Sequence, residues 1–177
     1  MKSTLIDGVF ELDSQIFSDK RGSFLSCFKD NDSFFKNIWL SRNVCQVNLS
    51  STSKKGSIRG LHYQIEPFSE CKIIRCLRGR VWDVAVDLRT NSKTYKKWVA
   101  VELCSSKKNA IFIPEGCAHG FQTLSDDSDL LYIHSKNYEP NHERGIRWND
   151  PNLEIDWPLA LTQISERDSK LPLFLEK

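Results

Sequence analysis

The sequence predicts an all-β protein built as an antiparallel sandwich or barrel, and three observations support this fold class. Short segments with alternating or fully apolar residues recur along the chain, and turn residues separate them at close intervals. Helical patterns are scarce, and the one short candidate covers residues 31–37. No Pro/Gly/Ser-rich linker divides the 177 residues, so we expect one domain over residues 1–177.

The expected elements follow from these patterns in chain order. Eight segments have strand character: residues 24–28, 44–49, 72–77, 81–88, 98–103, 110–113, 121–124 and 130–134. The helix candidate over 31–37 has Asp30, Asn31 or Asp32 as its N-cap. Beyond Glu139 four prolines interrupt the chain, so we expect irregular structure there.

Two of the expected strands place a charged residue among apolar neighbours. In segment 81–88 every even-numbered residue is apolar, and the opposite face combines small apolar residues with Asp83. A strand with apolar residues on both faces is expected to be covered on both sides, so Asp83 should be partly buried and need a partner. In segment 72–77, Lys72 shares a face with Ile74 and Cys76. Charged groups inside a small barrel are either paired for structure or arranged for chemistry.

Composition and charge exclude several classes of protein. The 25 Lys and Arg residues nearly balance the 23 Asp and Glu residues, which leaves no electrostatic footprint for nucleic acid. The longest apolar runs are too short to span a bilayer, and the N-terminus lacks the pattern of a signal peptide. The six cysteines show no C-x-x-C spacing and are expected to be reduced, buried thiols. We therefore expect a cytoplasmic protein with no nucleic-acid or membrane partner.

Segment 59–64 is unusually dense in functional side chains for the start of a strand. Gly60 permits the close approach of another backbone segment. His62 is suited to proton transfer near neutral pH, because the unperturbed pKa of histidine is about 6.5. A histidine base usually needs an orienting carboxylate, and Asp83 and Asp168 are the candidates. The structural alternative for this segment is a turn with a surface histidine.

Other side chains are candidates for the remainder of a site. Tyr132 shares a strand face with Leu130 and His134, and is either a second proton-transfer group or a core aromatic residue. Three basic residues are candidates for binding an anionic group such as a phosphate, namely Arg21, Arg59 and Lys72. Solvation at the surface is the alternative for Arg21. The four histidines lack the spacing of metal ligands, so no metal is expected.

Several motifs together resemble those of a known family. They are RGLHYQ at 59–64, GRVWDVAVDLR at 79–89, IPEGCAHGF at 113–121, GIRWNDP at 145–151 and IDWP at 155–158. In this order and over nearly the whole chain, they are similar to the motifs of the dTDP-4-dehydrorhamnose 3,5-epimerase family. The resemblance implies a cupin-type jelly-roll barrel with short peripheral helices. It also implies a homodimer that exchanges N-terminal strands, and a reaction that uses neither a metal nor another cofactor.

The resemblance further implies the substrate and the role of each matching residue. The substrate would be a nucleotide-linked 4-keto-6-deoxy sugar, typically dTDP-4-keto-6-deoxy-D-glucose on the way to L-rhamnose. His62 matches the general base, Tyr132 the general acid, Lys72 the lysine near the keto oxygen, and Asp168 the carboxylate that orients the histidine, with Asp83 as a further candidate for that last role. The residues that match substrate contacts are Arg21 (phosphate), Tyr138 (nucleobase stacking), Gln46, Asn48, Arg59, His119, Glu143 and Arg167.

Three positions depart from the pattern of this family. Ser26 stands where a glutamate is frequent, Glu70 where a glutamine is common, and Arg167 where a lysine is common. The proton-transfer residues are unaffected by these differences. The resemblance therefore implies that a base removes protons next to the C4 carbonyl and that an acid returns them on the other face of the ring.

Three alternatives to this function remain open on the sequence. An enzyme with the same residues would invert only C3 or only C5 of a modified nucleotide sugar. A non-catalytic sugar-binding cupin would have no need for a base and an opposing acid. A metal-dependent cupin oxygenase would need ligands that the chain does not show.

Overall fold

The computed structural model describes residues 1–29, 33–40 and 42–174, and it confirms the all-β fold class. The strands in this part of the chain are β1 (Lys2–Ser3), β2 (Phe10–Leu12), β3 (Ile16–Asp19), β4 (Gly22–Leu25), β5 (Gln46–Thr52), β6 (Ile58–Gln64), β7 (Lys72–Arg78), β8 (Arg80–Asp87), β9 (Trp98–Cys104), β10 (Ala110–Ile113), β11 (Cys117–Thr123), β12 (Ser128–His134) and β13 (Glu143–Gly145). The helices are α1 (Ser33–Trp39) and α2 (Glu166–Ser169).

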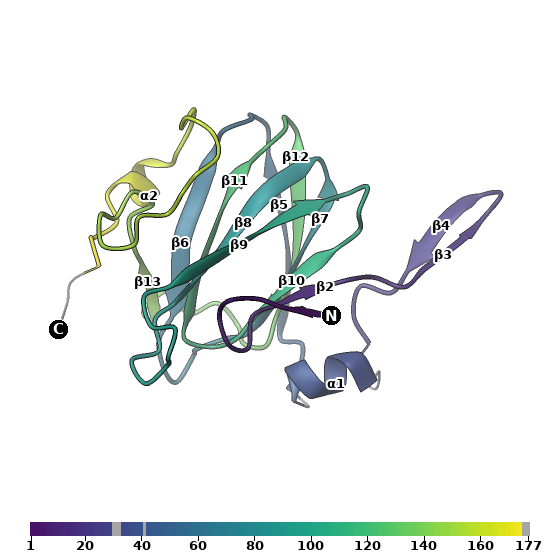
Figure 1. Cartoon of the computed structure of the whole chain (residues 1–177), viewed down its shortest axis with the longest axis horizontal. Helices are drawn as coiled ribbons and strands as arrows, with labels where there is room; N and C mark the ends of the chain where they lie inside the picture. Colours follow the sequence, from purple (N-terminus) through teal and green to yellow (C-terminus); the bar gives the residue numbers. More distant parts are fainter. Residues whose placement is uncertain (30–32, 41, 175–177) are drawn as a thin grey trace.

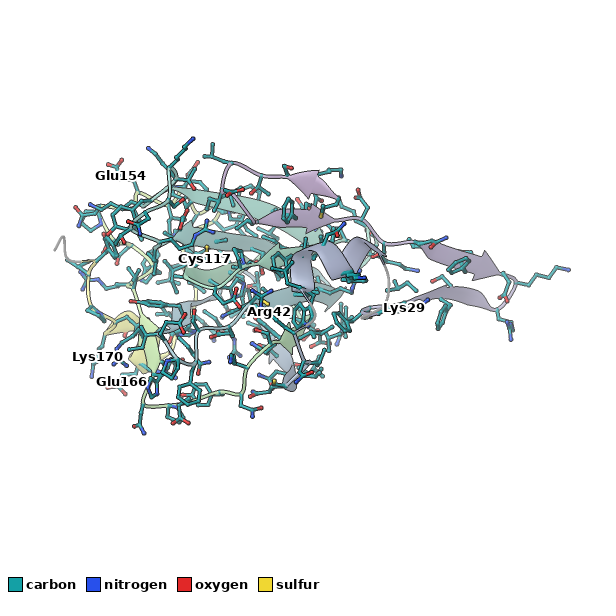
Figure 2. The ribbon with its side chains drawn as sticks, turned by 90° about the horizontal axis from the view of Figure 1, so that it is seen from below. Lys29, Arg42, Cys117, Glu154, Glu166 and Lys170 are labelled. Atoms are coloured by element: carbon teal, nitrogen blue, oxygen red, sulfur yellow. The ribbon has the colours of Figure 1, made fainter. Side chains whose placement is uncertain are left out.

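Two antiparallel sheets face each other and form the barrel (Figure 1). One sheet has the strand order β1-β2-β10-β7-β12-β5, and the other has the order β13-β6-β11-β8-β9. Strands β3 and β4 form a separate hairpin that projects away from the barrel, whereas α2 lies at the opposite end of the molecule (Figure 2). Figure 2 marks that far end by Glu166 and Lys170 of α2.

Apolar clusters fill the space between the sheets and also cover their outer faces. The inner cluster includes Ile74 of β7, Val81 of β8 and Leu130 of β12. A second cluster packs α1 and Phe28 against the outer face of the first sheet. A third packs the C-terminal segment against the outer face of the second sheet, around Val84. The burial of β8 on both faces confirms the expectation from its sequence.

Most expected strands are present, but several boundaries differ. The expected strand 24–28 is instead β4, which ends at Leu25, because the chain leaves the hairpin there and Phe28 packs on Trp39 with a ring separation of 5.1 Å. The helix extends to Trp39 because Phe35, Ile38 and Trp39 form one buried stripe. Its three N-cap candidates lie outside the described residues. The chain beyond Glu139 is largely irregular as expected, but it includes the short elements β13 and α2.

The cysteines and the helices bear on two further expectations. All six cysteines are free, and four of them are buried as expected. The expectation of burial is wrong for Cys27, which is half-buried, and for Cys45, which is exposed. Among the described residues no helix is long and apolar enough to cross a membrane.

The buried carboxylate of Asp87 is stabilised by several hydrogen bonds at the end of β8. Its fully buried carboxylate accepts hydrogen bonds from Arg89, from the Ser92 hydroxyl at 2.5 Å and from the Thr94 hydroxyl at 2.7 Å. Burial alone would raise the pKa of Asp87, but these hydrogen bonds outweigh burial and lower its pKa to about 2. The loop that follows β8 is therefore tied to the end of that strand.

We expect Asp87→Asn to lower the free energy of unfolding by about 2 kcal/mol at pH 7. Because the folded-state pKa is depressed, this stabilisation is complete above the unfolded value of about 3.9 and is lost as the pH falls through about 2. Urea titrations from pH 7 to pH 2 should show the difference between wild type and variant shrinking. The control is Asp156→Asn, which makes the same charge change at an exposed site. If the difference in unfolding free energy between wild type and variant did not depend on pH, the low pKa assigned to Asp87 would be wrong.

Candidate active site

A bulge between β6 and β11 sets which side chains of β6 face the interior. His119 pairs with His62 and Phe121 pairs with Arg59, so three steps along β6 match two along β11. This extra residue reverses the usual alternation, and therefore both Arg59 and His62 line the same cavity. Gly60 lies at the bulge, where an added Cβ would be 2.7 Å from the His119 carbonyl oxygen. The close approach expected for this glycine is confirmed.

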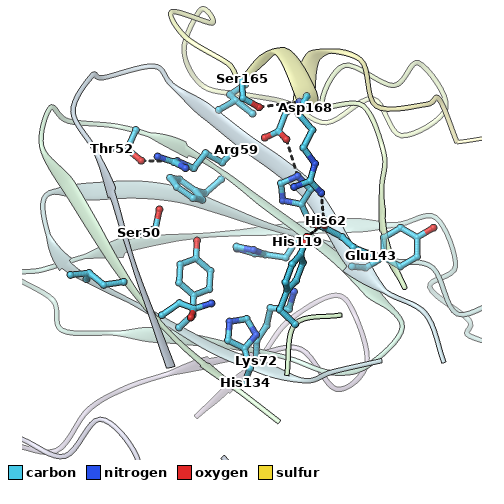
Figure 3. Close-up of a pocket in the computed structure, with 18 of the residues that line it drawn as sticks. Ser50, Thr52, Arg59, His62, Lys72, His119, His134, Glu143, Ser165 and Asp168 are labelled. Atoms are coloured by element: carbon cyan, nitrogen blue, oxygen red, sulfur yellow. Dashed lines mark hydrogen bonds and ion pairs between the residues drawn. The ribbon is translucent and has the colours of Figure 1, made fainter. Parts of the chain in front are cut away.

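His62 is held by the carboxylate of Asp168. The His62 Nε2 and Asp168 Oδ1 atoms are 2.9 Å apart, and Asp168 Oδ2 accepts a hydrogen bond of 3.0 Å from the Gly60 amide (Figure 3). Ser165 caps α2 by accepting a 3.0 Å hydrogen bond from the Asp168 amide, which fixes the position of the aspartate. Burial raises the pKa of Asp168, but the hydrogen bonds from His62 and Gly60 outweigh it and lower the pKa overall. The carboxylate is therefore ionised beside the imidazole.

Asp83 has a different histidine partner from the one expected. Both of its carboxylate oxygens lie 3.0 Å from Nε2 of His119, and Asp83 is fully buried. Strand β11 lies between β8 and β6 in the sheet, so His119 separates Asp83 from His62. Asp83 therefore orients His119 and does not contact His62 as a second orienting carboxylate. Burial raises the pKa of Asp83 despite the opposing effect of His119.

Tyr132 of β12 is held between two imidazole rings. Its ring centroid lies 5.8 Å from that of His119 in an edge-on arrangement and 5.8 Å from that of His134 in a stacked one. Burial raises the pKa of Tyr132 well above 10, and the nearby charge of Asp83 raises it further, while Arg59 opposes this. The phenol therefore carries its proton at neutral pH.

Lys72 lies deep in the cavity and is paired with Glu70. Their charged atoms are 2.9 Å apart, and each side chain is only 7% exposed. The other Glu70 oxygen accepts a hydrogen bond of 3.0 Å from the Gln64 amide, whose oxygen in turn accepts one of 2.6 Å from the Glu139 backbone. This chain of contacts fixes the lysine against β6 and the loop that precedes β13.

A second polar cluster lies at the mouth of the cavity. The Tyr138 hydroxyl donates a hydrogen bond of 2.6 Å to Glu143, which also pairs with Arg167 of α2. The Tyr138 amide donates to Gln46, whose own amide donates to Asn48. Tyr138 is 49% exposed, so its ring is accessible to a ligand.

The cavity has a volume of about 1370 Å³ and collects most of the predicted site residues. Those that line it are His62, Tyr132, Asp168, Lys72, Gln46, Asn48, Arg59, His119, Tyr138, Glu143 and Arg167. Asp83 lies behind His119. Arg21 does not line the cavity of its own chain, because it lies on the β3–β4 hairpin, where it is 91% exposed and bonded to Asp19.

Glu70 and His134 also line the cavity, and neither was among the predicted site residues. Glu70 was noted only as a departure from the motif, and its contact with Lys72 depends on the turn before β7. His134 shares a strand face with Tyr132, and this alternation was the available signal. Within the described part of the chain, no three His, Cys, Asp or Glu side chains are grouped as a metal site.

The fold and the cavity define the class of protein as a jelly-roll barrel with a large, polar small-molecule site. The chain matches the family described as dTDP-4-dehydrorhamnose 3,5-epimerase over residues 3–176. A dTDP-4-dehydrorhamnose 3,5-epimerase of Shigella flexneri is 42% identical over 166 residues, covering 93% of this chain and 90% of the relative. A dTDP-4-dehydrorhamnose 3-epimerase of Streptomyces niveus is 38% identical over 171 residues, covering 97% and 82%.

Solved structures agree with the sequence matches. The crystal structure of dTDP-6-deoxy-D-glucose-3,5-epimerase from Legionella pneumophila Philadelphia 1, in complex with dTDP-4-keto-L-rhamnose, has a TM-score of 0.91 at 38% identity. The match covers 97% of this chain and 90% of the Legionella pneumophila chain. The chain belongs to the dTDP-4-dehydrorhamnose 3,5-epimerase family. It is an isomerase of the cupin type that epimerises a nucleotide-linked 4-keto-6-deoxy sugar.

Proposed function

We propose that this enzyme converts dTDP-4-keto-6-deoxy-D-glucose to dTDP-4-keto-L-rhamnose by inverting both C3 and C5. The observation that carries the proposal is the presence, in one cavity, of a carboxylate-bound histidine, a protonated tyrosine and a buried lysine. The relatives named as 3,5-epimerases support inversion at both carbons. No electrons are gained or lost overall, so the reaction needs only proton transfer.

The proposed mechanism begins at His62. The C4 carbonyl acidifies the hydrogens on C3 and C5, and His62 removes one of them to give an enolate. Asp168 stabilises the imidazolium that forms and holds the ring in its tautomer. Lys72 stabilises the negative charge that develops on the C4 oxygen. Tyr132 then gives its proton to the carbon from the opposite face, which inverts that carbon, and exchange with solvent restores both groups.

The polar cluster at the mouth is proposed to bind the nucleotide. Tyr138 would stack on the nucleobase, while Glu143 and Arg167 fix the orientation of its ring. Arg59 is held by Thr52 at 3.0 Å and points along the cavity, where its charge suits the diphosphate (Figure 3). Binding these remote groups holds the sugar ring between the base and the acid. His119, Gln46 and Asn48 provide further polar contacts.

We also propose that the enzyme is a homodimer in which the β3–β4 hairpin of one chain covers the other. The hairpin exposes the apolar side chains of Phe17 (57%) and Phe24 (69%), which packing on a partner would bury. Strand β5 is the edge of its sheet and exposes Val47 and Leu49, so it offers a surface for such an arm. Arg21 would then reach the phosphates of the partner chain.

Arg21→Ala should raise KM for the dTDP-sugar by about tenfold or more, with little change in kcat. The reason is that a charged hydrogen bond to the diphosphate, worth about 1.5–3 kcal/mol, acts equally on the ground state and the transition state. Steady-state kinetics would measure this effect. Lys20→Ala is the control, because it removes the same charge from the adjacent exposed position. An unchanged KM in the Arg21 variant would exclude the phosphate contact.

The proposed reaction is tested by incubating the enzyme with dTDP-4-keto-6-deoxy-D-glucose in D₂O and analysing the sugar by NMR. Deuterium at both C3 and C5, with L-rhamno configuration in the product, is the expected result. Inversion and label at C3 alone would favour the second candidate, a 3-epimerase, which the similarity to the Streptomyces niveus 3-epimerase supports. A sugar that carries no label at C3 and none at C5 would contradict both candidate functions.

A further inference from the structure

His134 lines the cavity, and one of its ring nitrogens has no hydrogen-bond partner among the described residues. Its Nε2 atom is buried, and no described residue forms a hydrogen bond with it. Buried polar atoms are nearly always hydrogen-bonded, so an unpaired one on a residue that lines a ligand cavity is a candidate for a contact with the ligand. His134 lines the cavity next to Lys72 (Figure 3).

The strand register places His134 directly beside Lys72. It is paired with Gln46 on one side and with Lys72 on the other, so the three side chains form a row across β5, β12 and β7. Its ring is stacked on Tyr132 at a centroid distance of 5.8 Å and an interplanar angle of 9°. His134 is therefore next to both the lysine proposed for the C4 oxygen and the proposed acid.

The surroundings of His134 keep its imidazole neutral. Burial is the largest cause that lowers the pKa of His134 to about 4; the electrostatic interactions with Lys72 and His119 act in the same direction, and Glu70 opposes them. At neutral pH the ring therefore adds no charge beside Lys72. In the tautomer with a proton on Nε2, it offers one hydrogen-bond donor to the cavity.

The ion pair of Lys72 explains why a second donor is needed. Lys72 and Glu70 are both buried and lie 2.9 Å apart, so together they bring no net charge to the site. An enolate oxygen beside this pair meets an ammonium group whose charge is already balanced by a carboxylate. Further donors aimed at the oxygen would then contribute to stabilising the transition state.

We propose that His134 is a catalytic residue whose Nε2–H donates a hydrogen bond to the C4 oxygen of the bound sugar, beside Lys72. The bond strengthens as the enolate forms, and His134 keeps its proton throughout. This assignment rests on the proposed function, since it requires a C4 carbonyl in the cavity. It gives the site two donors for one oxygen, one from the buried ion pair and one from a neutral ring.

Two matched variants separate the donor from the ring. His134→Phe keeps an aromatic ring stacked on Tyr132 but removes the donor, whereas His134→Gln removes the ring and keeps an amide N–H at a similar distance from the backbone. The rate of deuterium uptake at C3 and C5 reports enolate formation by His62. We expect the Phe variant to lose about 10²-fold in this rate and in kcat, with KM within about threefold of wild type, and the Gln variant to stay within about tenfold.

The thermal unfolding midpoint and the affinity for dTDP show whether each variant is folded, and His134→Leu replaces His134→Phe if that variant is not. Wild-type exchange rates in the donor-free variant would overturn the proposal. So would normal exchange with loss of product alone, because His134 would then act only through Tyr132. Equal losses in the Phe and Gln variants would also overturn it. If wild type itself shows no exchange, the proposed function fails, which is a different result from the failure of His134 alone.

Discussion

His62→Asn should lower kcat by about 10²–10⁴-fold, the usual contribution of a general base. Asparagine preserves a polar side chain near Asp168 but cannot accept a proton from C3 or C5. Because enolate formation depends on this step, deuterium uptake at both carbons should fall by the same factor as product formation. Initial rates in D₂O, followed by NMR, measure the two quantities in one experiment.

The effect of His62→Asn must be separated from a loss of folding or binding. The affinity for dTDP should change little, because the groups proposed to bind the nucleotide lie at the mouth of the cavity around Tyr138 and Glu143. His142→Asn is the matched control, since His142 is partly buried against Phe68 and lies outside the cavity. Turnover near the wild-type rate in the His62 variant would remove this residue from the role of base.

The faces of the central strands could be predicted from the sequence because alternation determines them. The apolar even-numbered residues of segment 81–88 pack on the outer side of the sheet, and Asp83 faces inward. The same reasoning placed Lys72 among the inner residues of β7 and put Tyr132 on the inner face of β12. Local periodicity was sufficient for these positions, because successive side chains of a strand point to opposite faces.

Other parts of the site depend on contacts that no local pattern encodes. The bulge between the His119 and Phe121 pairs decides that Arg59 and His62 face the same cavity, although they are three positions apart in the strand. The order of strands in the sheet decides that Asp83 pairs with His119, and only the fold shows this order. The neutral state of His134 results from burial and from its neighbours Lys72 on β7 and His119 on β11, whose effect on the pKa outweighs that of Glu70 on the turn before β7.

The surroundings of Arg21 also could not be predicted from local sequence patterns. Alternating residues suggested a strand over 24–28, but the arm is formed by the pairing of β3 with β4 and leaves the barrel entirely. A role for Arg21 in binding phosphate then depends on a second chain, which a single sequence does not place. Because the β3–β4 hairpin projects away from the barrel (Figure 1), the expected contact of Arg21 with phosphate becomes a proposal that Arg21 reaches the site of the partner chain in a dimer.

Tyr132→Phe should reduce product formation by about 10²–10⁴-fold while deuterium uptake through His62 continues. Phenylalanine keeps the ring between His119 and His134, so only the transferable proton is lost. The expected result is dTDP-4-keto-6-deoxy-D-glucose that carries deuterium but retains its original configuration. NMR distinguishes this labelled substrate from the product by its coupling constants.

The two alternative outcomes of this experiment have different meanings. Normal uptake with normal product would place the acid elsewhere in the cavity. Loss of uptake together with product would mean that the hydroxyl already acts when the enolate forms, and the division of labour between His62 and Tyr132 would be wrong. Exchange without inversion is the specific sign of two groups on opposite faces, because a single base that removes and returns a proton on one face leaves the configuration unchanged.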